Sequence, residues 1–424
     1  MLPLEIRTEP ANNLQQDKKD WLYTINEHNF RKEQRLMSAN KNISVYTKLG
    51  VKPIINGRGC ITIHGGKTMS QTVVASMLEA SKSCVLFEDL MEKACEKIAK
   101  LTGAEGAFIS SGAASGLFIS GAACLTGKDS NAIEILPTVK SGKNHFIIST
   151  VDEHSYVHQA FRACGGQLVE VGTNFSVSKE DYADAITDKT AGLVFFYGSQ
   201  TKEELKGIIE VGQQHSVPVV VDCAAQIPPK SNLTDLVEMG VDLVVYSGGK
   251  GIGGPQCTGL ILGKKELIDA CVLNGSPNSA IGRSMKVGKE EIIGLLTAVE
   301  ELMSNDEEAL LKEWVSWCDT IVAGANGYSG VSAKTIQPYS HLAGGAHAPG
   351  SPTVEIDFRN STFDADYVRN KLENGDTPIM VSTEPWETEL TDAKDDVIVL
   401  GPGALQKGEA EIIAEELKQI LTNR

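Results

Sequence analysis

The sequence predicts an α/β protein in which a mostly parallel sheet of seven strands is followed by a smaller C-terminal α+β domain. Between residue 51 and about residue 300, short apolar runs alternate with amphipathic stretches, which is the pattern of strand–helix units around a parallel sheet. Beyond that point the pattern becomes lighter and mixed. A chain of 424 residues is also longer than one ordinary domain, so a second domain is expected.

Seven apolar runs have the length and composition of buried strands, and they are Ala107–Ser110, His145–Ser149, Leu168–Val171, Leu193–Tyr197, Val217–Asp222, Leu243–Tyr246 and Leu260–Leu262. Amphipathic stretches that end near glycine or polar turns predict helices. These are Glu88–Leu101, Tyr156–Cys164, Lys202–His215, Leu233–Met239 and, leading out of the sheet region, Glu290–Met303.

The sequence outside the sheet region predicts an N-terminal arm and a small C-terminal domain. Residues 1–50 are polar, with a weak helical pattern at Phe30–Met37, and we expect an N-terminal arm. Residues 51–300 would form the large domain and 301–424 the small one. In the small domain we expect strands at Thr353–Phe358, Ile379–Ser382 and Val397–Leu400, and helices at Ala365–Leu372 and Glu409–Leu421.

Charge and cysteine content narrow the function classes. Lys and Arg number 39 against 55 acidic residues, and the net charge of −16 opposes extended contact with a phosphate backbone, so we expect no nucleic-acid partner. The nine cysteines are scattered and form no CxxC pair, which disfavours a disulfide framework and fits a reducing cytoplasm.

No membrane or secretory segment is expected. The N-terminus interrupts every apolar run with charge, unlike a signal peptide. The segment Gly106–Gly127 is uncharged over nearly the ~20 residues that cross a bilayer, but nine of its residues are Gly or Ser. A buried strand, turn and helix is therefore the favoured interpretation.

Ligands of open α/β sheets bind beyond the carboxyl ends of the strands, so the polar residues there are the candidates for chemistry. Lys250 follows a strand inside the glycine-rich run SGGKGIGG, where a desolvated amine could form a Schiff base with a carbonyl. Asp222 ends the preceding strand and could pair with a pyridinium nitrogen. Taken singly, a solvated lysine and a helix-capping aspartate are the simpler explanations, but the ordered pair favours chemistry.

A phosphate site is predicted where Ser111, Gly112 and Ala113 open a helix, because free backbone N–H groups and the helix dipole attract anions. An ordinary N-cap is the alternative. His154 and His158 have the i, i+4 spacing of metal ligands, but no suitable third ligand follows, and no metal is expected. The GxGxxG run that starts at Gly249 is not a dinucleotide site, since Pro255 and another strand follow it rather than a helix.

Four motifs carry a resemblance to a known family: LTGAEGAFISSGAASG, VDCAAQIPP, DLVVYSGGKGIGGPQCTGLILGKKELIDAC and IGRSMKVGKEEIIGLL. The chain resembles, over about residues 50–420, the pyridoxal 5'-phosphate (PLP) enzymes of fold type I. Within them it is most similar to the group of bacterial selenocysteine synthase and D-glucosaminate-6-phosphate ammonia-lyase. The resemblance implies the fold type I PLP-dependent transferase fold, and a homodimer or larger homo-oligomer.

The resemblance also implies roles for individual residues. Lys250 would bind the aldehyde of PLP and act as the catalytic amine, and Asp222 would pair with the ring nitrogen. The remaining positions are a phosphate cradle of Ser111, Gly112, Ala113 and Ser247, a stacking imidazole at His154, a ring-hydroxyl partner at Gln226 and substrate cations at Arg283 and Lys286.

From these residues we expect a cytoplasmic PLP-dependent lyase. It would eliminate a β-substituent from a small amino acid or amino-sugar acid and give a 2-keto acid and ammonia. An aminotransferase, a sulfur or selenium transferase, and a non-catalytic PLP-binding protein are the alternatives. The short arm and the acidic charge of the whole chain argue against selenium transfer to tRNA. The segment VLNGSPNSAIGR departs from the ammonia-lyase pattern, which leaves the substrate open.

Overall fold

The computed structural model describes residues 44–151, 155–174, 176–336, 350–382 and 396–422. The chain divides into two compact units, Met1–Ile54 and Ile55–Arg424. In the first unit the described element is the short helix α2 (Val45–Lys48), capped by the Ser44 hydroxyl, which accepts a hydrogen bond from the Thr47 N–H. The expected helical segment Phe30–Met37 lies outside the described residues.

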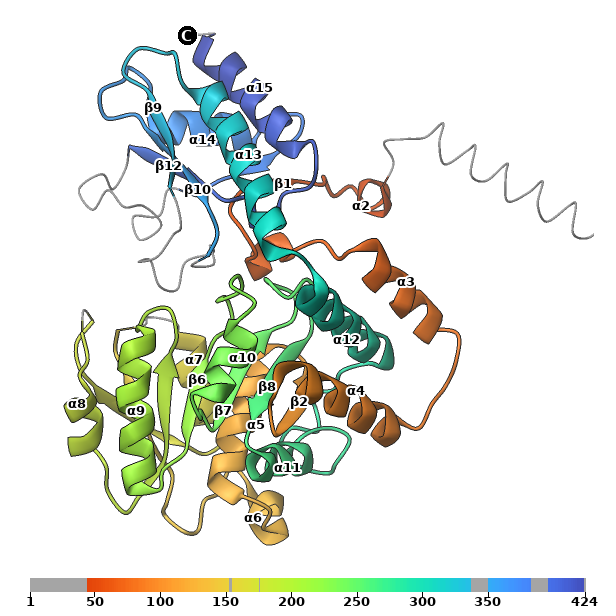
Figure 1. Cartoon of the computed structure of the whole chain (residues 1–424), viewed down its shortest axis with the longest axis vertical. Helices are drawn as coiled ribbons and strands as arrows, with labels where there is room; N and C mark the ends of the chain where they lie inside the picture. The colour runs from red at the N-terminus through yellow and green to blue at the C-terminus, as the bar shows by residue number, and fades with distance from the viewer. Residues whose placement is uncertain (1–43, 152–154, 175, 337–349, 383–395, 423–424) are drawn as a thin grey trace, which may run out of the picture. The chain divides into compact units, whose positions relative to one another are not determined.

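The second unit contains a seven-stranded sheet, and all seven predicted strands are confirmed (Figure 1). The spatial order is β2-β8-β7-β6-β5-β3-β4, in which β8 runs antiparallel to both neighbours and the other pairs are parallel. The bounds are β2 Gly106–Ser110, β3 His145–Ser149, β4 Gln167–Val171, β5 Thr190–Phe196, β6 Val219–Asp222, β7 Leu243–Ser247 and β8 Gly259–Gly263.

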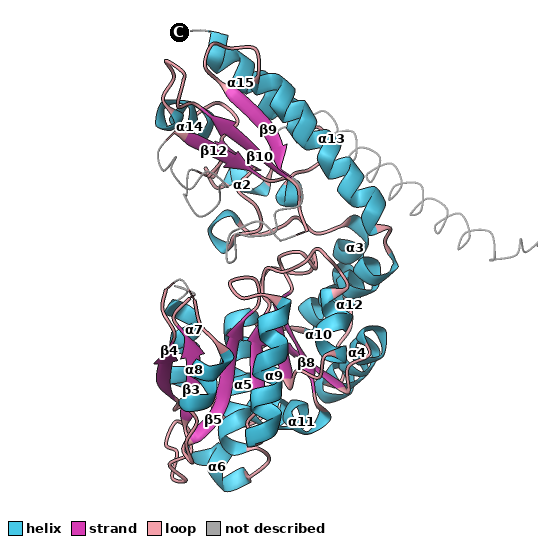
Figure 2. Cartoon of the chain, turned by 60° about the vertical axis from the view of Figure 1, so that its left-hand side comes forward, coloured by secondary structure: helices cyan, strands magenta, loops and turns pink. Residues whose placement is uncertain are grey.

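Helices cover both faces of this sheet (Figure 2). Successive strand residues point to opposite faces, so Val219 and Val221 of β6 belong to one apolar cluster and Val220 to the other. The first cluster includes α3 (Gln71–Ala80), α4 (Phe87–Thr102), α8 (Lys179–Asp184), α9 (Lys202–His215), α10 (Asn232–Glu238) and α12 (Lys289–Ser304); the second includes α5 (Ala113–Thr126), α7 (Ser155–Ala163) and α11 (Lys265–Asn274). The five helices predicted from amphipathic stretches are confirmed; a further short helix is α6 (Ser130–Ile135).

A second, antiparallel sheet of order β12-β10-β9 lies in the C-terminal region. Its strands are β9 (Ser332–Ile336), β10 (Thr353–Asp357) and β12 (Val397–Leu400), and its helices are α13 (Glu307–Ala325), α14 (Ala365–Glu373) and α15 (Glu409–Thr422). The sequence did not predict α13 or β9. Strand β9 (SAKTI) escapes notice because its exposed Ser332 and Lys334 leave only a weak apolar alternation.

A pair of two-residue strands joins distant parts of the chain within the second unit. Strand β1 (Ile55–Asn56) runs parallel to β11 (Ile379–Met380), so the segment that precedes α3 is tied to the C-terminal region. The predicted domain limits at residues 50 and 300 remain proposals, supported by the separation of the two larger sheets along the sequence.

The uncharged segment Gly106–Gly127 forms β2, a turn and α5, as the sequence favoured. Within the described ranges, no helix combines the length and apolar character needed to cross a membrane.

The packing of α13 on α15 generates a stability prediction. An ideal Cβ placed on the buried Gly324 would lie 2.6 Å from the Cα of Ala414, so the two helices meet backbone to backbone. Gly324→Val should lower the free energy of unfolding by about 1–3 kcal/mol through overpacking. Ala323→Val introduces the same β-branched side chain one residue earlier at an exposed position and is the control. Denaturant unfolding of both variants checks this; equal stability would contradict the close contact.

Candidate functional site

The carboxyl ends of three strands meet at one edge of the large sheet. Because β8 is antiparallel to both β2 and β7, those two strands point the same way, and Gly259 of β8 pairs with Ser110 on one side and Ser247 on the other. Strand β6 is parallel to β7 and ends beside it at Asp222. The strand ends that carry the predicted site residues therefore lie at one edge of the sheet.

Lys250 sits in a glycine turn whose shape depends on close backbone packing. The Gly248 N–H donates to the Thr258 carbonyl at 2.8 Å, and the Gly254 N–H donates to the Gly248 carbonyl at 2.8 Å. A Cβ on Gly251 would lie 2.1 Å from the carbonyl oxygen of Ile227, which no side chain could tolerate. The glycines around the lysine are thus required by the turn, and they hold Lys250 against the loop that follows β6.

The half-buried Lys250 lines a small cavity of about 20 Å³. Its walls come from six segments: Gly59, Cys60 and Lys67; Ala225, Ile227 and Pro228; Lys250 and Gly251; Trp314 of α13; Ser351; and Gly403. The Lys67 ammonium lies 5.5 Å from the centroid of the Trp314 ring, within the range of a cation–π contact. Two amines therefore face one confined space.

Cys60 shares this environment. Its thiol donates to the Gly403 carbonyl at 3.6 Å. Burial raises the pKa of the Cys60 thiol, and the ammonium groups of Lys67 and Lys250 oppose that rise. Cys60 lines the same cavity as both lysines.

Asp222 is the last residue of β6, and Gln226 lies on the loop that follows it. The half-buried Asp222 carboxylate accepts a hydrogen bond from the Ala224 N–H at 3.0 Å, which orients it at the sheet edge. Gln226 is 5% exposed and packs against Gly198, where a Cβ would lie 2.2 Å from the amide nitrogen. Its buried Oε1 has no hydrogen-bond partner among the described residues. Burying an unpaired acceptor is costly, so this atom fits a ligand that donates a hydrogen bond to it.

The residues of the predicted anion cradle lie at the start of α5. Gly112, with φ of 112°, caps the helix without a side-chain hydrogen bond, and the Ser111 hydroxyl donates to the Ser115 hydroxyl at 3.2 Å. The first-turn N–H groups therefore keep the dipole character that attracts an anion. Gly259 approaches Gly112 so closely that a Cβ would lie 2.4 Å from its carbonyl carbon. Because Ser247 pairs with Gly259, it lies beside this cradle.

Arg283 and Lys286 do not reach the Lys250 cavity. Both side chains are exposed on the segment between α11 and α12. Between them, Met285 lines a surface pocket with Ala114 and Ser115 of α5. Arg283 and Lys286 therefore lie on the surface of this chain, in a segment that passes near the start of α5.

The two histidines have different outcomes. His154 lies outside the described residues. His158 faces Glu170, with Nδ1 3.9 Å from Oε1, and its ring centroid lies 6.1 Å from that of Phe196. No group of three or more His, Cys, Asp or Glu side chains in the described ranges is arranged to hold a metal ion.

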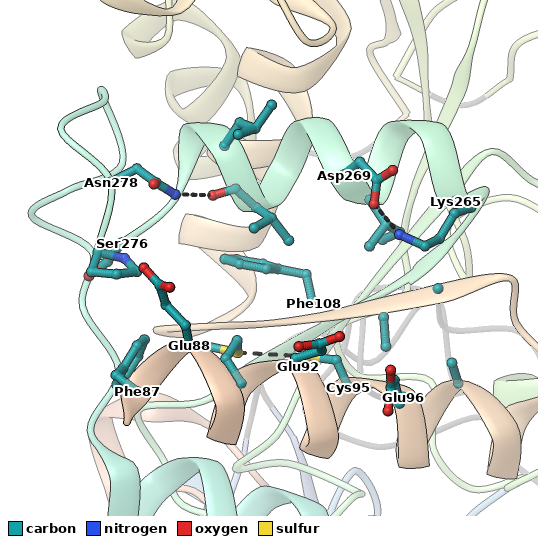
Figure 3. A pocket seen from close by; sticks show the side chains of 18 of the residues that line it. Phe87, Glu88, Glu92, Cys95, Glu96, Phe108, Lys265, Asp269, Ser276 and Asn278 are labelled. Atoms are coloured by element: carbon teal, nitrogen blue, oxygen red, sulfur yellow. Dashed lines mark hydrogen bonds and ion pairs between the residues drawn. The ribbon is translucent and has the colours of Figure 1, made fainter. Parts of the chain in front are cut away.

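A larger pocket of about 470 Å³ lies elsewhere, between α4, β2 and α11 (Figure 3). Phe108 of β2 lies between the two helices, while Glu88 and Glu92 project from α4. The lysine there, Lys265, forms an ion pair with Asp269. This pocket shares no lining residue with the Lys250 cavity, so size alone does not identify the reaction site.

Sequence reasoning did not single out Cys60, Lys67, Trp314, Ser351 or Gly403 as site residues. Cys60 and Lys67 belong to the stretch Asn56–Lys67, which resembles the glycine-rich entry loop of the PLP family, and Gly403 belongs to GPGALQKGEAEII, which resembles its C-terminal domain. Trp314 and Ser351 come from segments without a local motif. Only the tertiary fold brings them to Lys250.

A model of the L-seryl-tRNA selenium transferase (SelA) family matches residues 85–312. The 5'-C-glycyluridine monooxygenase-decarboxylase of a Streptomyces species is 34% identical over 69% of this chain and 73% of its own length. The D-glucosaminate-6-phosphate ammonia lyase of Salmonella typhimurium is 32% identical over 61% of this chain and 69% of its own. A solved structure of D-glucosaminate-6-phosphate ammonia-lyase matches with a TM-score of 0.74 and 27% identity, over 90% of this chain and 99% of that one. The predicted fold type I architecture and the family resemblance are confirmed.

The charges around Cys60 generate a prediction about thiol reactivity. Since Lys67 lowers the pKa of this thiol, Lys67→Met should raise that pKa and slow alkylation at pH 9 by a factor on the order of three to ten, whereas Lys67→Arg should not. Iodoacetamide labelling followed by peptide mass spectrometry measures the alkylation rate of Cys60 separately from those of the other cysteines. The exposed Cys84 is the internal control. Unchanged labelling of Cys60 in Lys67→Met would show that the two groups are not neighbours.

Proposed function

Because the chain belongs to the L-seryl-tRNA selenium transferase (SelA) family, whose model matches more than half of it, we propose that it is a PLP-dependent lyase. It removes a β-substituent from a small amino acid or amino-sugar acid. The observation that carries this proposal is the position of Lys250: its amine lies at the carboxyl edge of the sheet, next to the strand that ends in Asp222, and faces a confined cavity.

The residues present fit PLP. Ser111, Gly112, Ala113 and Ser247 would hold the phosphate, the Asp222 carboxylate would pair with the ring nitrogen, and Lys250 would bind the aldehyde. The unpartnered acceptor of Gln226 supports the assignment, because a ring hydroxyl can donate to it. When bound, PLP supplies an electron sink for negative charge that develops on the substrate. His154 would stack on the ring.

The chain's own groups account for the proton transfers. Once free of the cofactor, Lys250 would act as the general base that takes the proton from Cα. The confined cavity would limit water near that carbon, and the Asp222 carboxylate would pair with the ring nitrogen. Loss of the β-substituent, followed by hydrolysis, would give a 2-keto acid and ammonia. Arg283 and Lys286 would bind a distal anionic group such as a phosphate.

The cellular setting is part of the proposal. All nine cysteines are free thiols in the structure, which fits a reducing cytoplasm. We expect a homo-oligomer. The exposed Arg283 and Lys286 would then complete a substrate site near the start of α5.

Oxidative decarboxylation is a second candidate, favoured by the similarity to the 5'-C-glycyluridine monooxygenase-decarboxylase. Both relatives are named for substrates that carry an amine and a carboxylate, so substrate binding alone does not separate the two reactions. Oxygen consumption and carbon dioxide release would indicate decarboxylation. Ammonia release under anaerobic conditions would indicate elimination.

The lyase proposal predicts ammonia release without an added keto acid. Purified PLP-loaded protein would be screened against D- and L-amino acids and phosphorylated amino-sugar acids, with ammonia measured by a coupled assay. Lys250→Ala should lose the visible absorbance of the lysine-bound aldehyde and reduce turnover by about 10²- to 10⁴-fold. Lys206→Ala removes an exposed lysine on α9 and should behave as wild type. A requirement for an added keto acid would instead indicate an aminotransferase.

The role of Asp222 predicts a separation of binding from turnover. Asp222→Ala should retain PLP, held through Lys250 and the phosphate cradle, but reduce turnover by at least about 10²-fold because the ring nitrogen loses its partner. Absorbance spectra and steady-state kinetics measure the two effects. The exposed Asp188→Ala is the matched control. Full activity in Asp222→Ala would remove this carboxylate from the mechanism.

A further inference from the structure

The cavity beyond Lys250 is built by residues other than those proposed to hold PLP. Asp222, Gln226 and the phosphate cradle come from strand ends and from the start of α5, and none of them lines this cavity. Apart from the lysine turn and the loop residues Ala225, Ile227 and Pro228, its walls come from the segment 59–67, from α13, and from Ser351 and Gly403. The cavity therefore gives Lys250 a set of neighbours separate from the proposed cofactor groups, and a substrate could enter there.

The backbone fixes the position of Lys67 in this cavity. The Lys67 N–H donates to the carbonyl of Gly249, the neighbour of Lys250, at 3.2 Å. At the other end of the segment, the buried Asn56 side chain donates to the carbonyls of Gly59, at 2.7 Å, and Gly66, at 3.3 Å. The loop is thus closed on itself and joined to the lysine turn, so Lys67 is placed with little freedom of its backbone.

The Lys67 side chain lies over an aromatic ring and has no counterion within the described ranges. Its ammonium lies 5.5 Å from the centroid of the 5%-exposed Trp314 ring. No ion pair involves Lys67 among the described residues, and no carboxylate is among the residues that line the cavity. A half-buried cation held in this way attracts an anion that enters the cavity.

The chemistry at Lys250 identifies that anion. A substrate amine that displaces Lys250 must come to the position of this lysine, and in an α-amino acid the carboxylate is bonded to the same carbon as the amine. We infer that Lys67 binds the α-carboxylate of the substrate and that Trp314 positions its ammonium, so the site selects α-amino acids over simple amines. This inference rests on the proposed function and refines it, since Arg283 and Lys286 remain for a distal anionic group.

Kinetics of the PLP-loaded enzyme test the inference. Lys67→Met should raise KM for the amino-acid substrate about 10- to 100-fold with a smaller change in kcat, as expected for loss of a charge-assisted hydrogen bond. Lys67→Arg should recover most of the affinity. Trp314→Leu should raise KM by about two- to fivefold, because it removes a cation–π contact from the Lys67 ammonium. Lys128→Met, which removes an exposed lysine that pairs with Asp269, is the control.

Anion binding provides a readout independent of turnover. Acetate titrated into the PLP-loaded enzyme at constant ionic strength should change the tryptophan emission in a saturable way, and its neutral isostere acetamide should not. The change should be absent in both Lys67→Met and Trp314→Phe. An unaltered KM and acetate response in Lys67→Met, in an enzyme that still releases ammonia, would overturn the inference alone. An intact acetate response in a protein that turns over no amino acid would overturn the proposed lyase function instead.

Discussion

The candidate site depends on backbone contacts that only glycine permits. Gly251 presses against the carbonyl of Ile227, and Gly259 against the backbone of Gly112. The first contact holds the Lys250 turn on the loop after β6, and the second brings the end of β7 beside the start of α5. Any side chain at these positions would separate the amine from the anion cradle. The glycine-rich sequence SGGKGIGGPQCTG is therefore a requirement of packing as much as of chemistry.

Much of the large sheet was predictable because its strands are buried on both faces. Such strands appear in the sequence as continuous apolar runs, and the helices between them have clear apolar stripes. Val219–Asp222 and Lys202–His215 are examples in which sequence and structure agree closely. Strand β9 shows the opposite case: with one exposed face and a lysine at its centre, it has no signal above that of a loop.

The site was predictable only where it follows strand ends. Lys250, Asp222 and Ser111 come directly after apolar runs, so the general rule for α/β sheets locates them together. Trp314 and Gly403 follow no such rule, because α13 and the C-terminal region meet the lysine turn through tertiary packing. The positions of Arg283 and Lys286 also needed the structure, since family resemblance indicates a role for them but not that they are exposed on this chain.

The pairing of β1 with β11 has a thermodynamic consequence. These strands are two residues long, and β1 ends at Asn56, whose side chain closes the loop that carries Lys67. Rupture of so short a ladder would free the loop without melting either of the larger sheets. Local opening at Ile55 and the inferred binding of an anion at Lys67 would then be linked equilibria, and an occupied cavity would slow amide hydrogen exchange at β1.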